Sequence, residues 1–93
     1  MAQNTDIVLT ADDWTLLTDA NITSITFQNK GTYYILVKGT TDTTKPTNND
    51  GSIRYNPGQG ERNVSLSDLF VGISAVRVWA YAPKSLEVMV SHA

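Results

Sequence analysis

The stretch that decides the fold is Ala75–Ser91, with the sequence A-V-R-V-W-A-Y-A-P-K-S-L-E-V-M-V-S. It contains two runs of alternating apolar residues, separated at Pro83. Because successive side chains of a strand point to opposite sides, each run has one aliphatic face to bury. These faces are formed by Val76, Val78 and Ala80 in the first run and by Leu86, Val88 and Val90 in the second. We expect a terminal β-hairpin with a loop at Pro83–Ser85, with Val78 opposite Val90 and Ala80 opposite Val88.

The opposite face of this expected hairpin also carries large side chains, which are Arg77, Trp79, Tyr81, Glu87 and Met89. Together they present more apolar surface than a face that meets only water should have. A second partner must therefore cover this face, and the sequence leaves three choices: another sheet, a loop or another subunit.

Length and composition limit the class of protein. The chain has 93 residues, of which 41% are hydrophobic and 17% charged, so we expect one domain with a real core. It has no cysteine, which excludes a disulfide framework and a thiolate metal site. The net charge is −2 and the lysines and arginines are scattered, so we expect no nucleic-acid binding. The first residues do not resemble a signal peptide and no apolar run would span a membrane, so we expect a protein made in the cytoplasm.

The rest of the chain consists of short β runs separated by turns. We expect strands at 6–10, 14–18, 22–29, 32–38 and 52–55, with a further extended piece at 61–65. A capped helix over residues 11–17 is the alternative to the second strand. Asn29-Lys30-Gly31 is the clearest turn, which Gly31 would close with a positive φ.

The run at 32–38 is apolar on both faces, because Tyr34 and Leu36 alternate with other large residues. We expect it to be a central strand or one that a neighbouring subunit covers. Residues 39–51 have no large apolar side chain and predict a long, flexible surface loop. Ser65 can cap a short helical turn near 66–70. The sequence thus predicts an all-β fold over residues 1–93, an antiparallel β-sandwich that is jelly-roll-like or a small barrel.

The search for catalytic groups finds little. His92 is the only histidine and lies beside the C-terminus, where chain ends commonly fray, whereas a general base needs a rigid setting. The predicted loop at 39–51 has four side chains with oxygen ligands that would allow weak calcium binding: Asp42, Asn48, Asn49 and Asp50. Their spacing differs from the EF-hand pattern, and surface loops are commonly polar without binding a metal. We expect no enzyme activity, no cofactor and no metal.

The aromatic side chains offer two possible functions beside core packing: a platform for stacking sugars and anchors for a subunit interface. They are Trp14, Trp79, Tyr33, Tyr34, Tyr55 and Tyr81. Trp79 and Tyr81 are the strongest interface candidates, because they lie opposite the aliphatic face. Four further residues are interface candidates. Tyr34 lies in the predicted strand at 32–38, which is apolar on both faces, and Arg77, Glu87 and Met89 lie on the same face of the expected hairpin as Trp79. Arg77 and Glu87, on facing strands, would form an interface ladder.

Four segments together resemble short virion proteins of tailed bacteriophages: W-T-L-L-T-D-A-N-I-T-S-I-T-F-Q-N (14–29), G-S-I-R-Y-N-P-G-Q-G-E-R-N (51–63), V-R-V-W-A-Y-A-P (76–83) and V-S-H-A (90–93). The resemblance covers most of the chain and carries no catalytic signature. It implies a β-rich structural protein of the virion, made in the bacterial host: a head decoration protein, a spike-base protein or a small tail-associated component.

Such a protein would act as a symmetric homo-oligomer that contacts a phage capsid or tail protein. In that arrangement the surplus apolar strand surface would be buried between copies, and loop 39–51 would project away from the contact. The alternative function is a carbohydrate-binding module or receptor-binding β domain that uses exposed aromatic rings to bind a glycan.

Overall fold

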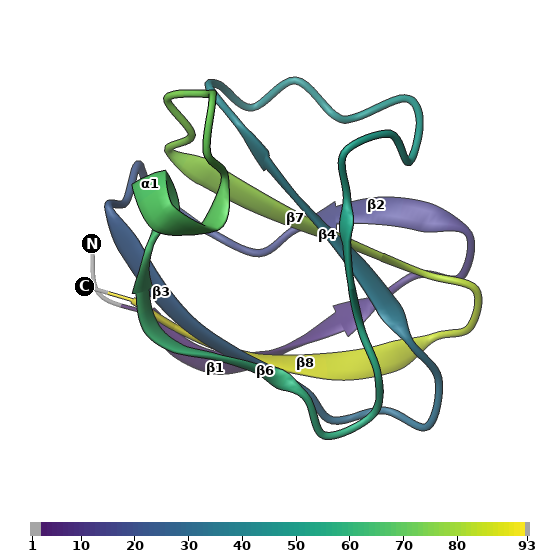
Figure 1. Ribbon diagram of the computed structural model, residues 1–93. Helices are drawn as coiled ribbons and strands as arrows, with labels where there is room; N and C mark the ends of the chain where they lie inside the picture. Colours follow the sequence, from purple (N-terminus) through teal and green to yellow (C-terminus); the bar gives the residue numbers. More distant parts are fainter. Residues whose placement is uncertain (1–2, 93) are drawn as a thin grey trace.

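The computed structural model describes residues 3–92, which form eight strands and one helical turn (Figure 1). In chain order these are β1 (Gln3–Leu9), β2 (Asp13–Leu16), β3 (Ser24–Asn29), β4 (Ile35–Thr40), β5 (Ile53–Tyr55), β6 (Gly60–Ser65), α1 (Leu66–Leu69), β7 (Arg77–Ala82) and β8 (Leu86–His92). Met1, Ala2 and Ala93, which belong to the predicted domain 1–93, lie outside the described residues.

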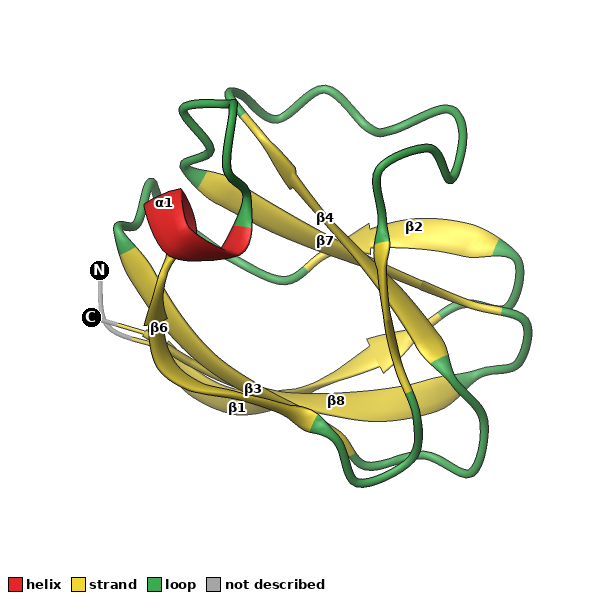
Figure 2. Cartoon of the chain, in the orientation of Figure 1, coloured by secondary structure: helices red, strands yellow, loops and turns green. Residues whose placement is uncertain are grey.

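The strands form two antiparallel sheets of four. Sheet A has the order β1-β8-β3-β6 and sheet B the order β2-β7-β4-β5. The pairs β1·β8, β2·β7, β3·β6 and β4·β5 match each strand of the first half with its counterpart from the other end of the chain. This is the order produced by rolling up one long hairpin, the jelly roll. Figure 2 shows the two layers of strands, with the helical turn at one end. The predicted antiparallel β-sandwich with one short helical turn is confirmed.

The core lies between the inner faces of the two sheets, where alternation places the aliphatic side chains. Sheet A contributes Leu9, Ile25, Phe27, Val88 and Val90, and sheet B contributes Ile35, Val37, Val78, Ala80 and Ala82, all 0–1% exposed. The strand predicted at 32–38 is central, since β4 lies between β7 and β5, but its bounds differ: it begins at Ile35 and ends at Thr40, and residues 32–34 precede it. Alternation therefore predicted correctly which side chains face inward.

The predicted terminal hairpin is wrong. β7 pairs with β2 and β4 in sheet B, whereas β8 pairs with β1 and β3 in sheet A. The connection at 83–85 crosses from one sheet to the other, so Val78 and Val90 face each other across the core and not across a ladder. A hairpin and a pair of strands in opposite sheets would each bury one apolar face per strand. Because the chain crosses between the sheets, β7 and β8 are both central strands.

Three smaller expectations also change. Residues 13–16 form a strand, so the alternative helix over 11–17 is wrong. Gly31 does not have a positive φ and does not close a hairpin, because β3 and β4 belong to different sheets. A Cβ there would lie 2.5 Å from Leu86 Cβ, so Gly31 is suited to a close approach. His92 does not fray: it ends β8 and is 7% exposed.

The helical turn α1 begins as predicted. Ser65 is its N-cap, and its side chain accepts a hydrogen bond from the Asp68 backbone N–H at 3.2 Å. Leu66 and Phe70 are buried and close one end of the core. Within residues 3–92, no helix has the length and apolar character needed to cross a membrane.

Candidate functional site

The outer face of sheet B carries large apolar side chains beyond those between the sheets. Trp14 lies opposite Tyr81 and Leu16 lies opposite Trp79 in the strand register. The Trp14 and Tyr81 ring centroids are 5.5 Å apart, and the Trp79 indole N–H donates to Thr40 Oγ1 at 3.0 Å. Both tryptophans are only 5% exposed, so neither ring presents a face to solvent.

The loop of residues 41–52 is bound to β2 and β4, two strands of this sheet. Its Lys45 Nζ lies 3.1 Å from Asp13 Oδ1 in β2, and its Asn48 Oδ1 accepts a hydrogen bond from Lys38 Nζ in β4 at 3.3 Å. Figure 1 shows the loop (teal) on the side of sheet B that faces away from sheet A. Both tryptophans are thus enclosed within the single chain. That the loop projects away from a symmetric contact between copies stays a prediction.

The six predicted interface residues do not form one surface. Arg77, Trp79, Tyr81 and Tyr34 lie on the outer side of sheet B, whereas Glu87 and Met89 lie on the outer side of sheet A. Since β7 and β8 are not paired, the expected ladder between Arg77 and Glu87 does not exist. An interface role for each of these residues stays a prediction, but Trp79 has little surface left to offer a partner.

The side chains of these residues have local partners. Arg77 Nε donates to Asn21 Oδ1 at 2.9 Å, and the Arg54 guanidinium lies 4.1 Å from the centroid of the Tyr34 ring. The Tyr81 hydroxyl donates a hydrogen bond to Asp12 Oδ1 at 3.1 Å. The Tyr81 pKa is raised, mainly by desolvation and then by this hydrogen bond.

Sugar stacking requires an open aromatic face, and the structure leaves few. Both tryptophans are enclosed, and Tyr55 is buried against Phe27 with a ring-centroid distance of 4.9 Å. Burial and a hydrogen bond to Glu61 raise the Tyr55 pKa above its usual value. Tyr33 is 47% exposed, with Lys84 Nζ 5.8 Å from its ring centroid. A glycan platform built on Trp14 and Trp79 is therefore not available in this conformation.

An apolar surface that the chain does not cover lies beside α1. Val71 is 84% exposed and Ile73 is 48% exposed. They border a groove of about 340 Å³ whose apolar lining also includes Ile53, Leu69 and Phe70. We call these five residues the apolar end. Such a contiguous patch is more informative than single exposed side chains, because patches of this kind mark contact sites.

Local packing explains why the apolar end is exposed. Phe70 is buried against β4 at Gly39, where a Cβ would lie only 2.5 Å from Phe70 Cδ2. Gly72 then takes a positive φ of 100°, which turns the chain immediately after the anchored ring. Val71 is left at the tip of this turn. The sequence pattern did not lead us to Val71 and Ile73, although V-G-I in a turn was the available signal.

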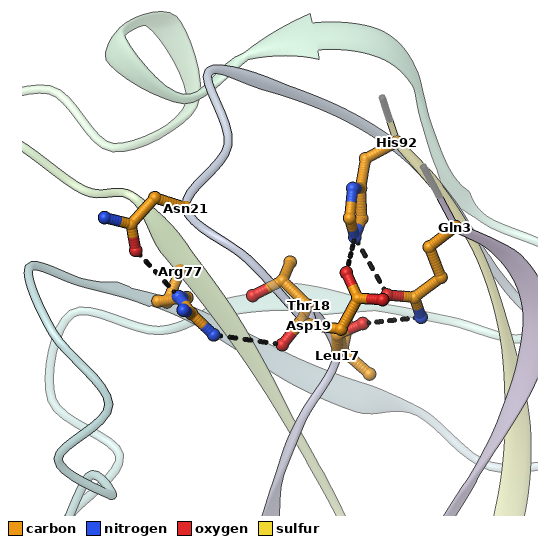
Figure 3. Close-up of polar contacts among 7 residues, drawn as sticks. All are labelled: Gln3, Leu17, Thr18, Asp19, Asn21, Arg77 and His92. Carbon is orange, nitrogen blue, oxygen red and sulfur yellow. Dashed lines mark hydrogen bonds and ion pairs between the residues drawn. The ribbon is translucent and has the colours of Figure 1, made fainter. Parts of the chain in front are cut away.

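A polar cluster joins the ends of β1 and β8 to the β2–β3 connection (Figure 3). His92 Nε2 lies 2.8 Å from Gln3 Oε1 and 3.3 Å from Asp19 Oδ1. His92 Nε2 thus faces two acceptor oxygens. Gln3 Nε2 in turn donates to Leu17 O at 3.0 Å. The His92 side chain is fully buried here, and these contacts hold the chain ends together.

The oxygen donors of the loop do not converge on a common point. Asp42 Oδ1 accepts from the Thr44 backbone N–H, which lowers the Asp42 pKa, and Asn48 Oδ1 accepts from Lys38 and from the Asp50 backbone. Among the described residues, no group of three or more histidine, cysteine, aspartate or glutamate side chains is arranged to hold a metal ion. The loop oxygens instead stabilise the loop itself.

The apolar end is therefore the surface best suited to contact another molecule, and the polar cluster at the chain ends has a structural role. Comparison of the chain with protein-family models, with curated proteins and with solved structures finds no match.

Proposed function

We propose that this protein is a structural component of a bacteriophage virion, a head decoration or spike-base protein, which acts through protein–protein contacts as a symmetric homo-oligomer. The observation that carries the proposal is the apolar end, where Val71 and Ile73 remain exposed beside a groove while larger apolar rings elsewhere are covered. A chain that encloses both tryptophans but leaves Val71 and Ile73 exposed has a surface suited to a protein partner.

Two further features support the proposal. The sequence segments quoted above resemble small virion proteins of tailed phages. The jelly-roll strand order is one that capsid domains use, as do lectins and cupins, so the fold agrees with the proposal without selecting it.

The test is to locate the protein in particles. Particles from a lysate of the bacterium that expresses the gene are purified on a density gradient and analysed by mass spectrometry and by antibody labelling in the microscope. We expect the protein on the head or tail in a copy number set by the particle's symmetry. A protein that stays entirely in the soluble fraction while intact particles form without it would overturn the proposal.

The surface is tested with purified protein added back to particles that lack it. Val71→Lys places a charge on a side chain that is 84% exposed, so it should leave the fold intact and abolish binding to the particle. Tyr33→Lys is the matched control, because Tyr33 is also an exposed large side chain but lies away from the apolar end. Equal binding by both variants would assign the contact to another surface.

A further inference from the structure

The four edge strands of the sandwich differ in how they are protected against pairing with another chain. An edge strand presents unpaired backbone N–H and C=O groups, and proteins usually block it by shortness, bulges or coverage. The edges are β1 and β6 in sheet A, and β2 and β5 in sheet B.

Three of the edges carry protection. β5 has three residues and β2 has four, and the aspartate that begins β2, Asp13, is bound by Lys45 of the loop of residues 41–52. β6 is bulged: Arg62 and Asn63 lie together opposite Thr26, and Asn63 has a positive φ of 47°. Each of these edges would therefore pair poorly with a further strand.

β1 has none of these features. It has seven residues, and its register with β8 runs without a bulge from Gln3 opposite His92 to Leu9 opposite Leu86. It contains no proline. Its one charged residue, Asp6, is paired with Lys30 at 2.8 Å. On the outer face, Val8 is 61% exposed, which is unusual for an apolar residue in a strand.

We propose that β1 is the copy-to-copy contact of this protein: the β1 strands of two molecules pair antiparallel about a two-fold axis and join two A sheets into one of eight strands. The proposal rests on the oligomeric state that the proposed function requires, and it names the contact. Backbone hydrogen bonds supply the affinity in this mode of association, so it does not need a large apolar interface.

Charge disfavours one register of this pairing. If the two-fold axis is perpendicular to the sheet, the outer faces of both A sheets lie on the same side of the joined sheet. An outward-facing β1 residue of one copy is then opposite an outward-facing β1 residue of the other. An axis at Asp6 would place the two Asp6 carboxylates opposite each other, which is unfavourable. An axis at Ile7 avoids this, and it places Val8 of each copy opposite Asp6 of the other. We infer this second register.

The chain contains no cysteine, so one introduced cysteine reports a single contact. In the inferred register the two Ile7 residues are directly opposite, at a Cα separation of about 4.5–5.5 Å that a disulfide can span. Ile7→Cys should therefore form a covalent dimer on mild oxidation. Tyr33→Cys is the control: Tyr33 is 47% exposed whereas Ile7 is half-buried, so cross-linking by random collision would favour Tyr33→Cys.

A second variant tests the contact without relying on the half-buried Ile7. Val8→Glu places a carboxylate opposite Asp6 of the other copy, twice per dimer by symmetry, and should weaken association about tenfold or more. Val8→Lys places a cation there and should retain association. Light scattering over a range of protein concentrations measures the association, and circular dichroism checks that both variants are folded.

The outcomes separate this inference from the proposed function. Cross-linking of Ile7→Cys beyond Tyr33→Cys, with association lost in Val8→Glu and kept in Val8→Lys, supports the β1 contact. An oligomer that persists unchanged in Val8→Glu and gives no Ile7→Cys dimer overturns the β1 contact and leaves assembly through another surface intact. A wild-type protein that is monomeric at every concentration and on the particle overturns both.

Discussion

Asn29 is a buried polar side chain on which the fold should depend strongly. It is 0% exposed and ends β3. Its Nδ2 donates to Tyr33 O at 2.7 Å and to Tyr55 O at 3.2 Å, and its Oδ1 accepts from the Gly31 backbone N–H at 2.9 Å. The side-chain amide at the end of β3 in sheet A thus binds both the β3–β4 connection and the end of β5 in sheet B. Replacing it should destabilise the whole sandwich.

The cost of Asn29→Ala follows from these bonds. Three hydrogen bonds are lost, and each contributes about 1 kcal/mol net when its partners are left partly buried. We therefore expect the free energy of unfolding to fall by about 3 kcal/mol. For a domain of this size, that corresponds to a decrease of roughly 12–24 °C in the midpoint of thermal unfolding.

Asn29→Asp tests the direction of the bonds because it preserves the shape. The oxygen that replaces Nδ2 would face two carbonyl oxygens, which raises the pKa of the introduced carboxyl above its unfolded value. The charged form is then disfavoured in the folded state, so the destabilisation is smallest below about pH 4 and grows as the pH rises. It should grow by about 1.4 kcal/mol for each unit by which the pKa is raised.

The assay is urea and thermal unfolding followed by circular dichroism at pH 4 and pH 7. Asn49→Ala and Asn49→Asp are the matched controls, because Asn49 lies in the exposed loop. The reasoning is refuted if Asn29→Ala costs less than about 1 kcal/mol. It is also refuted if Asn29→Asp shows the same pH dependence as Asn49→Asp.

Four further substitutions test the packing. Gly60→Ala would push a Cβ into the Phe27 backbone carbonyl, so we expect a loss of about 3 kcal/mol or more and a low yield of folded protein. Gly39→Ala should displace Phe70 and cost about 1–3 kcal/mol, with faster proteolysis near α1 as a second readout. Thr18 Oγ1 is buried without a hydrogen-bond partner among the described residues, so Thr18→Val should raise stability by about 1 kcal/mol; a loss would mean that the hydroxyl is satisfied, for example by water. Trp79→Phe removes the bond to Thr40 and should lower stability by about 1–2 kcal/mol without changing the oligomeric state measured by light scattering.

Alternation predicts the direction of side chains but not the partner of a strand. Val78, Ala80, Val88 and Val90 were all expected to be buried, and all are 0% exposed. The same pattern arises whether the two runs pair side by side or face each other across a sandwich, because both arrangements bury one face of each strand. The connection at Pro83–Ser85 is short enough for either, so local sequence could not decide between them.

Features that depend on distant contacts were also beyond the sequence. His92 is buried because Asp19 and Gln3 meet it, and Gln3 is 89 positions away. Val71 is exposed because Phe70, the residue after α1, is held against Gly39 in β4. In both cases the residue type gave no indication of burial, since a terminal histidine usually frays and a valine is usually buried.

The case for assembly changes once the tryptophans are placed. The sequence suggests an oligomer because Trp79, Tyr81 and their neighbours exceed what one face can expose, but both tryptophans are already buried within a single chain. The surplus surface therefore no longer argues for a second copy. What remains for partners is smaller and lies elsewhere: the exposed Val71 and Ile73 of the apolar end, and the unprotected β1 edge with Val8. Loss of Trp79 would report on folding, whereas charges at Val8 and Val71 report on assembly.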